Sequence, residues 1–156
     1  MRLLLQNGAK LEARTQTGKT AVHEACSGGQ ADALRVLLQH GANADAVDDY
    51  LETPLHMAAA AGEIDALRVL LRRGGGLNKL NDVRGAGAGR AAGRTLTRPC
   101  FVAQEGRTAL HQAAAFGHEE VVEALLAHGA DSRIKDEVRT ERSTIDCTRL
   151  APQLTR

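Results

Sequence analysis

Hydrophobic and polar positions follow the same order several times along the chain. The heptapeptide Asp-Ala-Leu-Arg-Val-Leu-Leu at 32–38 returns unchanged at 65–71, and a relaxed copy, Glu-Val-Val-Glu-Ala-Leu-Leu, occupies 120–126. Apolar residues three and four positions apart form one face of a helix, and the charged residues form the other. Recurrence at a fixed period of this size is typical of a repeat protein. Because residues 2–5 match the end of the same pattern, we expect the chain to begin inside a fourth copy.

Each complete copy predicts two short helices, which gives units at 17–49, 50–82 and 105–137. In the first unit, the hydroxyl of Thr20 can cap a helix that Gly28 and Gly29 interrupt. The second helix of that unit spans about 30–40 and ends at Gly41. Pro54 suits the first position of the corresponding helix in the second unit, where its missing N–H costs no hydrogen bond. The chain is therefore predicted to be all-α, a solenoid of stacked helix-turn-helix units joined by hairpin-like turns.

The segments outside these units differ from them in composition. The first two signature threonines, Thr20 and Thr53, are 33 residues apart, whereas Thr53 and Thr108 are 55 apart, so 22 residues are inserted. The insert at 83–104 is rich in Gly, Ala and Arg and has no acidic residue or apolar period, which predicts a flexible loop. Residues 1–16 are interpreted as a partial repeat, and 138–156 as a partial cap or disordered tail.

Composition and charge narrow the class of protein. Twenty basic and nineteen acidic residues leave a formal net charge of +1, which argues against a nucleic-acid-coating protein. Three cysteines without a pairing motif favour a reduced chain, so we expect it in the cytoplasm, the nucleus or both. No apolar run approaches the roughly 18 residues of a membrane span, and no membrane partner is expected.

The residues that could bind a metal or act in catalysis are explained better by their positions in the repeat than by a reactive site. The six histidines all occupy repeat positions and lack the spacing of metal ligands. His23 and Cys26 could touch on one helix, but no third group is present to orient them as a nucleophile and base. Asp45, Asp48 and Asp49 lack the remaining residues of a calcium loop, so a solvated turn is favoured. We therefore expect no catalytic residue, no cofactor, no metal and no small-molecule substrate.

Four arginines of the insert form a basic cluster, Arg84, Arg90, Arg94 and Arg98. Such a cluster can contact nucleic acid or an acidic partner electrostatically. Phe101 is the only aromatic residue nearby, and it lies at the edge of the cluster. A disordered loop that its charge keeps soluble is therefore the favoured interpretation, and nucleic-acid binding is the disfavoured one.

Three tetrapeptides connect the sequence to a known family. Thr-Ala-Val-His at 20–23, Thr-Pro-Leu-His at 53–56 and Thr-Ala-Leu-His at 108–111 resemble the signature of ankyrin repeats. Each is followed at one offset by a Gly and then by Leu-Leu-x-x-Gly. One departure is Leu51, which stands where the other units have Gly18 and Gly106, and it puts the geometry of the second turn in question.

The resemblance implies a non-catalytic protein-binding module, an adaptor, scaffold or regulatory subunit that is a monomer or part of a larger complex. It implies a concave face on which turn tips and first helices contact a partner protein of unknown identity. Carried over by position, the partner-binding residues are Gln16, Thr17, Lys19, Glu24, Asp49, Tyr50, Glu52, Met57, Glu105, Arg107, Gln112 and Phe116. Tyr50, Met57 and Phe116 are the expected anchors because large apolar groups dominate interfaces. For Phe116, packing over its own inter-helix turn is an equal alternative.

A second hypothesis is a substrate-recognition subunit of a ubiquitin ligase. Many ankyrin proteins of that kind carry a C-terminal suppressor-of-cytokine-signalling box. The tail after 137 is too short for this box and lacks a Leu/Cys-rich helix pair, so the hypothesis needs a longer parent chain. An enzyme is the weakest of the alternatives, because no set of reactive residues converges in the sequence.

Overall fold

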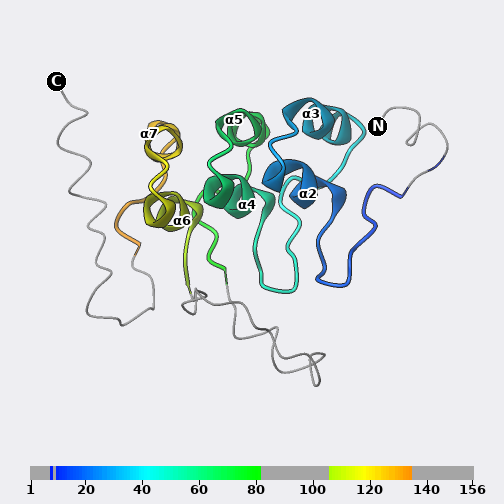
Figure 1. Ribbon diagram of the computed structural model, residues 1–156, viewed down its shortest axis with the longest axis horizontal. Coiled ribbons are helices and arrows are strands. Elements are labelled where there is room, and N and C mark those ends of the chain that lie inside the picture. Colours follow the sequence, from blue (N-terminus) through cyan, green and yellow to red (C-terminus); the bar gives the residue numbers. More distant parts are fainter. Residues whose placement is uncertain (1–7, 9, 82–105, 135–156) are drawn as a thin grey trace, which may run out of the picture.

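The fold is an array of helix pairs that stand side by side, and Figure 1 views the helices nearly along their axes. The computed structural model describes Gly8 and residues 10–81 and 106–134. Its helices are α2 (Ala21–Ser27), α3 (Ala31–Gln39), α4 (Pro54–Ala61), α5 (Ile64–Arg72), α6 (Ala109–Phe116) and α7 (Glu119–Ala127). The predicted pair of short helices in each unit is confirmed, and α3 agrees with the predicted range of about 30–40 to within a residue at each end. The predicted insert at 83–104 and tail at 138–156 lie outside the described residues, and so do residues 1–7 and 9 of the partial repeat.

The helices form two layers. The first helices of the units, α2, α4 and α6, pack side by side, and the second helices, α3, α5 and α7, pack over them (Figure 1). The described turns between units project from the side of the first-helix layer that faces away from the second helices. No β-strand occurs in the described part of the chain, which is thus an all-α repeat fold.

The seam between units is made of small and branched apolar side chains. In the repeated heptapeptide of α5, Leu67, Leu70 and Leu71 are buried, while Asp65 and Arg68 are exposed. Each fully buried leucine contributes roughly 2 kcal/mol through the hydrophobic effect. One unit cannot enclose such a face alone, so stacking of neighbouring units completes the core.

The charged positions of the heptapeptide lie on the outer surface, as predicted. Arg35 and Asp32 form an ion pair at 3.2 Å, one helical turn apart on α3. Most of both side chains is in contact with solvent, so this pair contributes little to stability.

Every first helix begins with the same reciprocal cap. Thr20, Thr53 and Thr108 are the N-cap residues, each in an extended conformation. The backbone N–H of each threonine donates to Nδ1 of the histidine three positions later, at 3.1, 3.2 and 3.3 Å. The signature histidine thus ties each first helix to the turn before it in all three units.

A second periodic contact fixes one unit against the next. A side-chain oxygen at the end of one unit accepts a hydrogen bond from a backbone N–H of the following unit. The acceptor and donor residues are Glu12 and Asn43 at 2.9 Å, Asp45 and Gly76 at 2.8 Å, and Asn78 and Asp131 at 2.9 Å. The last pair spans the position of the 22 extra residues. The third unit therefore stacks on the second as the second stacks on the first.

Candidate interaction face

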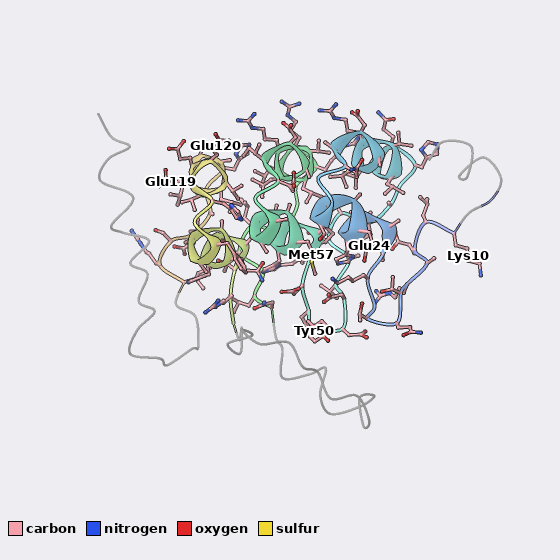
Figure 2. All side chains as sticks on the ribbon, viewed as in Figure 1. Lys10, Glu24, Tyr50, Met57, Glu119 and Glu120 are labelled. Atoms are coloured by element: carbon pink, nitrogen blue, oxygen red, sulfur yellow. The ribbon has the colours of Figure 1, made fainter. Side chains whose placement is uncertain are left out.

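The expected anchors Tyr50 and Met57 lie on the side of the array opposite the second helices. Figure 2 shows Glu24 on α2, Met57 on α4 and Tyr50 in the turn that precedes α4. Glu119 and Glu120, by contrast, project from α7 in the other layer. The stacking of units thus turns corresponding positions of successive units into one continuous surface.

We call this surface the hairpin face and define it by five residues of the first two units, namely Glu24, Asp49, Tyr50, Glu52 and Met57. Glu24 and Asp49 are exposed, and the other three are half-buried. Half-buried groups of this kind keep a fixed position while presenting part of their surface to a partner. Such a combination suits recognition better than long, freely moving side chains do.

The turns that carry this face are closed in one common way. A backbone N–H at the start of each turn donates a hydrogen bond to a carbonyl at its end. The donor and acceptor residues are Thr15 and Lys19 at 2.9 Å, Asp48 and Glu52 at 3.1 Å, and Asn81 and Arg107 at 3.0 Å. The side chain of the first residue also accepts backbone N–H groups within the turn. The turn-closing role of Thr15, Asp48 and Asn81 was not predicted from the sequence, and their recurrence every 33 positions was the available signal.

Asn81 brings together the two ends of the inserted segment. Its carbonyl accepts from the N–H of Gly106 at 3.0 Å, and its Oδ1 accepts from the N–H of Arg107 at 2.9 Å. Asn81 and Arg107 are 26 positions apart, whereas the corresponding Asp48 and Glu52 are four apart. The extra residues therefore enter and leave at the tip of the third turn, without changing how that turn is closed.

Leu51 holds the second turn in a conformation that usually requires glycine. Its φ angle is +54°, in the left-handed region, and the corresponding Gly18 and Gly106 have φ of +76° and +64°. The departure at Leu51 has therefore not altered the course of the turn. The cost is steric strain of roughly 1–2 kcal/mol for a residue with a Cβ atom.

Asp48 corrects the expectation of a solvated turn at 45–49. Its side chain is only 3% exposed, and Oδ1 accepts the N–H groups of Tyr50 and Glu52, both at 2.9 Å. Burial raises the pKa of this carboxyl above its ordinary value, although the two backbone hydrogen bonds oppose the shift. Asp48 is thus a structural acid, buried because the turn folds around it.

Glu52 connects the second and third units. Its Oε1 accepts from Nε2 of Gln112 at 2.9 Å and from Nδ2 of Asn81 at 3.3 Å. Among the described residues, nothing donates to its other oxygen, Oε2. Sequence reasoning missed this cluster because Gln112 lies 60 positions from Glu52 and the spacing pattern gives no sign of their contact.

Two of the predicted partner-binding residues are buried, which corrects their expected exposure. Arg107 is 8% and Gln112 is 1% exposed. The backbone of Arg107 closes the third turn, and the side chain of Gln112 is used in its bond to Glu52. Neither side chain is presented to a partner in this structure, and Glu105 lies outside the described residues.

Most of the other predicted residues are accessible. Gln16, Thr17, Glu24, Asp49 and Phe116 are exposed, while Lys19, Tyr50, Glu52 and Met57 are half-buried. This accessibility is required for partner binding but does not by itself demonstrate it, so their role stays a prediction.

Phe116 combines the two alternatives that the sequence left open. The ring stacks on His118 of its own inter-helix turn, with centroids 6.4 Å apart and planes 28° apart. Even so, 53% of the residue is exposed. It is therefore partly held by its own turn and partly available, at the end of α6.

The histidine rings and the described cysteine already have structural roles. Nε2 of His23 bonds the carbonyl of Glu52 at 3.1 Å, and Nε2 of His56 bonds that of Arg107 at 3.0 Å. Burial lowers the pKa of His56 to about 4 and raises that of the Cys26 thiol to about 12. Cys26 is thus held as an unreactive thiol in the core.

The described residues form neither a metal-binding cluster nor a helix that could span a membrane. Over residues 10–81 and 106–134, no three metal-binding side chains gather into a cluster. Within those ranges, no helix has both the length and the apolar character needed to cross a membrane.

Comparison with known families agrees with the repeat geometry. A family profile described as ankyrin repeats, in three copies, matches residues 1–81. A second profile, described as an ankyrin repeat, matches residues 105–137. Together they cover most of the chain and leave out the insert and the tail. No curated protein matched the sequence.

Proposed function

This chain belongs to the ankyrin repeat family, and we propose that it is a non-catalytic module that holds a partner protein on the hairpin face. Ankyrin repeats are generally protein–protein interaction modules, and the array here presents its turn tips and first helices on one side (Figure 2). In a cell, such a module would act as an adaptor, a scaffold or a regulatory subunit.

The observation that carries the proposal is the position of Tyr50 and Met57. Both are half-buried on the same side of the second unit, one in the turn and one on the first helix. The positions that correspond to Met57 in the other units hold Glu24 and Gln112, which are polar. Large apolar groups that replace polar ones on an accessible face are typical centres of an interface.

The groups that could be reactive, two histidine rings and a thiol, are engaged in the scaffold, which supports a non-catalytic role. The rings of His23 and His56 bond at both nitrogens, to a turn on one side and to the following unit on the other. The pKa of Cys26, at about 12, keeps that thiol protonated at neutral pH. These groups are committed to the scaffold, and the cytoplasm or nucleus suits a scaffold with a free buried thiol.

Co-purification from cells tests the proposal. A tagged chain with Tyr50→Ala and Met57→Asp should lose partners that the unchanged chain retains, while its helical circular dichroism spectrum stays the same. A matched control, Asp65→Ala with Arg68→Asp, alters two exposed residues of α5 in the other layer. Partners that survive the first pair of substitutions and are lost with the second would contradict the assigned face.

A further inference from the structure

Three of the five residues of the hairpin face are acidic. Glu24 and Asp49 are exposed, and Glu52, three positions after Asp49, is half-buried. Two accessible cations border these residues among the described ones, Lys19, which is half-buried, and Arg14, which is exposed and donates to the carbonyl of Val47 at 3.1 Å. The guanidinium of Arg107 in the third turn is buried. Acidic side chains thus outnumber basic ones where a partner would make contact, which favours an approaching positive charge.

Glu52 is the most firmly placed of these acids. Two amide groups, from Gln112 and Asn81, donate to Oε1 at 2.9 and 3.3 Å and fix the carboxylate in place. Both amide-bearing residues are 1% exposed, so the two donors are themselves held by the core. Because nothing in the described chain donates to Oε2, that oxygen can accept a charge-assisted hydrogen bond without reorganisation.

Two apolar residues lie close to Glu52 in the sequence, and they suit a partner side chain that has an aliphatic part as well as a charge. Tyr50 precedes Glu52 by two positions in the turn, and Met57 follows on α4. A tyrosine ring and a flexible thioether can both pack against aliphatic carbon. Lysine and arginine have such a carbon chain below their charge, and a large apolar neighbour in the partner would fill the remaining contact.

On the basis of the proposed function, we infer that the partner segment is cationic and amphipathic, with an Arg or Lys bound to Glu52 and an adjacent large apolar side chain packed on Tyr50 and Met57. The inference depends on the combination of a fixed carboxylate with an apolar surface. The acids of α7, Glu119, Glu120 and Glu123, are exposed in the second-helix layer and provide a comparison of equal charge.

Selection from a library of short random peptides displayed on phage tests this inference. The peptides that the full chain selects should contain more Arg and Lys than Asp and Glu, together with a large apolar residue. Their affinity, measured by fluorescence anisotropy, should fall about tenfold or more in Glu52→Gln, since the amide keeps an acceptor for Gln112 and Asn81 but loses the charge. The control Glu120→Gln with Glu123→Gln should change affinity by no more than about twofold.

The peptide measurements distinguish an error in the cationic inference from an error in the proposed binding face. Selected peptides that are neutral or acidic, and that lose binding in Met57→Asp, would overturn the cationic inference and leave the hairpin face in place. Peptides whose affinity is unchanged by Tyr50→Ala and Met57→Asp would contradict the proposed function itself. Selection of no peptide above the background of an empty support would overturn the inference, because a preformed carboxylate and apolar surface should retain some of them.

Discussion

Nε2 of His56 donates a hydrogen bond to the backbone carbonyl of Arg107 at 3.0 Å, across 51 positions of the sequence. Its Nδ1 accepts the backbone N–H of Thr53, so the proton of the neutral ring must lie on Nε2. One uncharged ring therefore closes the cap of α4 and links the second unit to the third. Protonation of Nδ1 would remove an acceptor from a buried N–H, and this is why the charge state of His56 matters.

Stability should consequently fall as the pH is lowered from 7 to 5. Burial lowers the pKa of His56 to about 4 in the folded chain, against an ordinary value of 6.5, so the unfolded chain binds the proton more readily. The stability from the neutral ring is present above pH 6.5 and is lost as the pH falls toward 4, by on the order of 2 kcal/mol at pH 5. Urea unfolding at the two pH values measures this difference.

The variant His56→Gln separates this effect from other titrating groups. It should be less stable than the unchanged chain at pH 7, and its stability should depend less on pH between 7 and 5. Burial lowers the pKa of His23 too, which leaves a smaller slope of the same sign, while the raised pKa of Asp48 acts in the opposite direction at lower pH. Equal stability of the unchanged chain at pH 7 and pH 5 would contradict the assignment of a buried neutral His56.

Leu51 offers a substitution that should stabilise the chain. Its φ of +54° is strained for leucine, and 46% of the residue is exposed, so little packing is lost when the side chain is removed. Leu51→Gly should raise the free energy of unfolding by about 1 kcal/mol, which a thermal melt would record as an increase in Tm. Leu51→Ala retains the Cβ atom and the strain, so it should change stability little. A glycine variant less stable than the alanine variant would show that the turn is not strained.

Removal of the insert should leave the fold intact. Asn81 already joins Gly106 and Arg107, so deletion of 83–104 connects Asp82 to Glu105 and restores a turn of the usual length. The shorter loop should raise the free energy of unfolding by up to about 2 kcal/mol, because each doubling of loop length costs about 0.6 kcal/mol. Replacement of 83–104 by a Gly/Ser segment of equal length provides the control and should leave stability close to that of the unchanged chain. Loss of the cooperative melt after deletion would show that the insert supports the fold.

Much of the fold could be predicted because the same pattern of apolar and signature residues occurs in each repeat. Leu67 and Leu70 follow helical spacing in a heptapeptide that occurs twice, and both are buried in the seam between units. The signature Thr53 and His56 are three positions apart, so their contact is local and can be read directly from the sequence. Family profiles match these same segments.

The candidate face could be predicted only in part, because its accessibility depends on contacts between units. Gln112 occupies the same repeat position as Met57, yet Gln112 is buried, since Glu52 of the preceding unit accepts its amide. Arg107 corresponds to Lys19, but it lies at the turn that Asn81 closes and is likewise buried. Position within a repeat predicts which side of the array a residue occupies, and the neighbouring unit determines whether its side chain is exposed.

Site-specific photocrosslinking in cells tests the central claim, that a partner protein binds the hairpin face. A photoreactive phenylalanine analogue would replace Met57 on that face or, as the matched control, Arg68 on the outer surface of α5. We expect a crosslinked partner band from position 57 and none from position 68. A band from position 68 with none from position 57 would contradict this claim and place the partner on the second-helix layer.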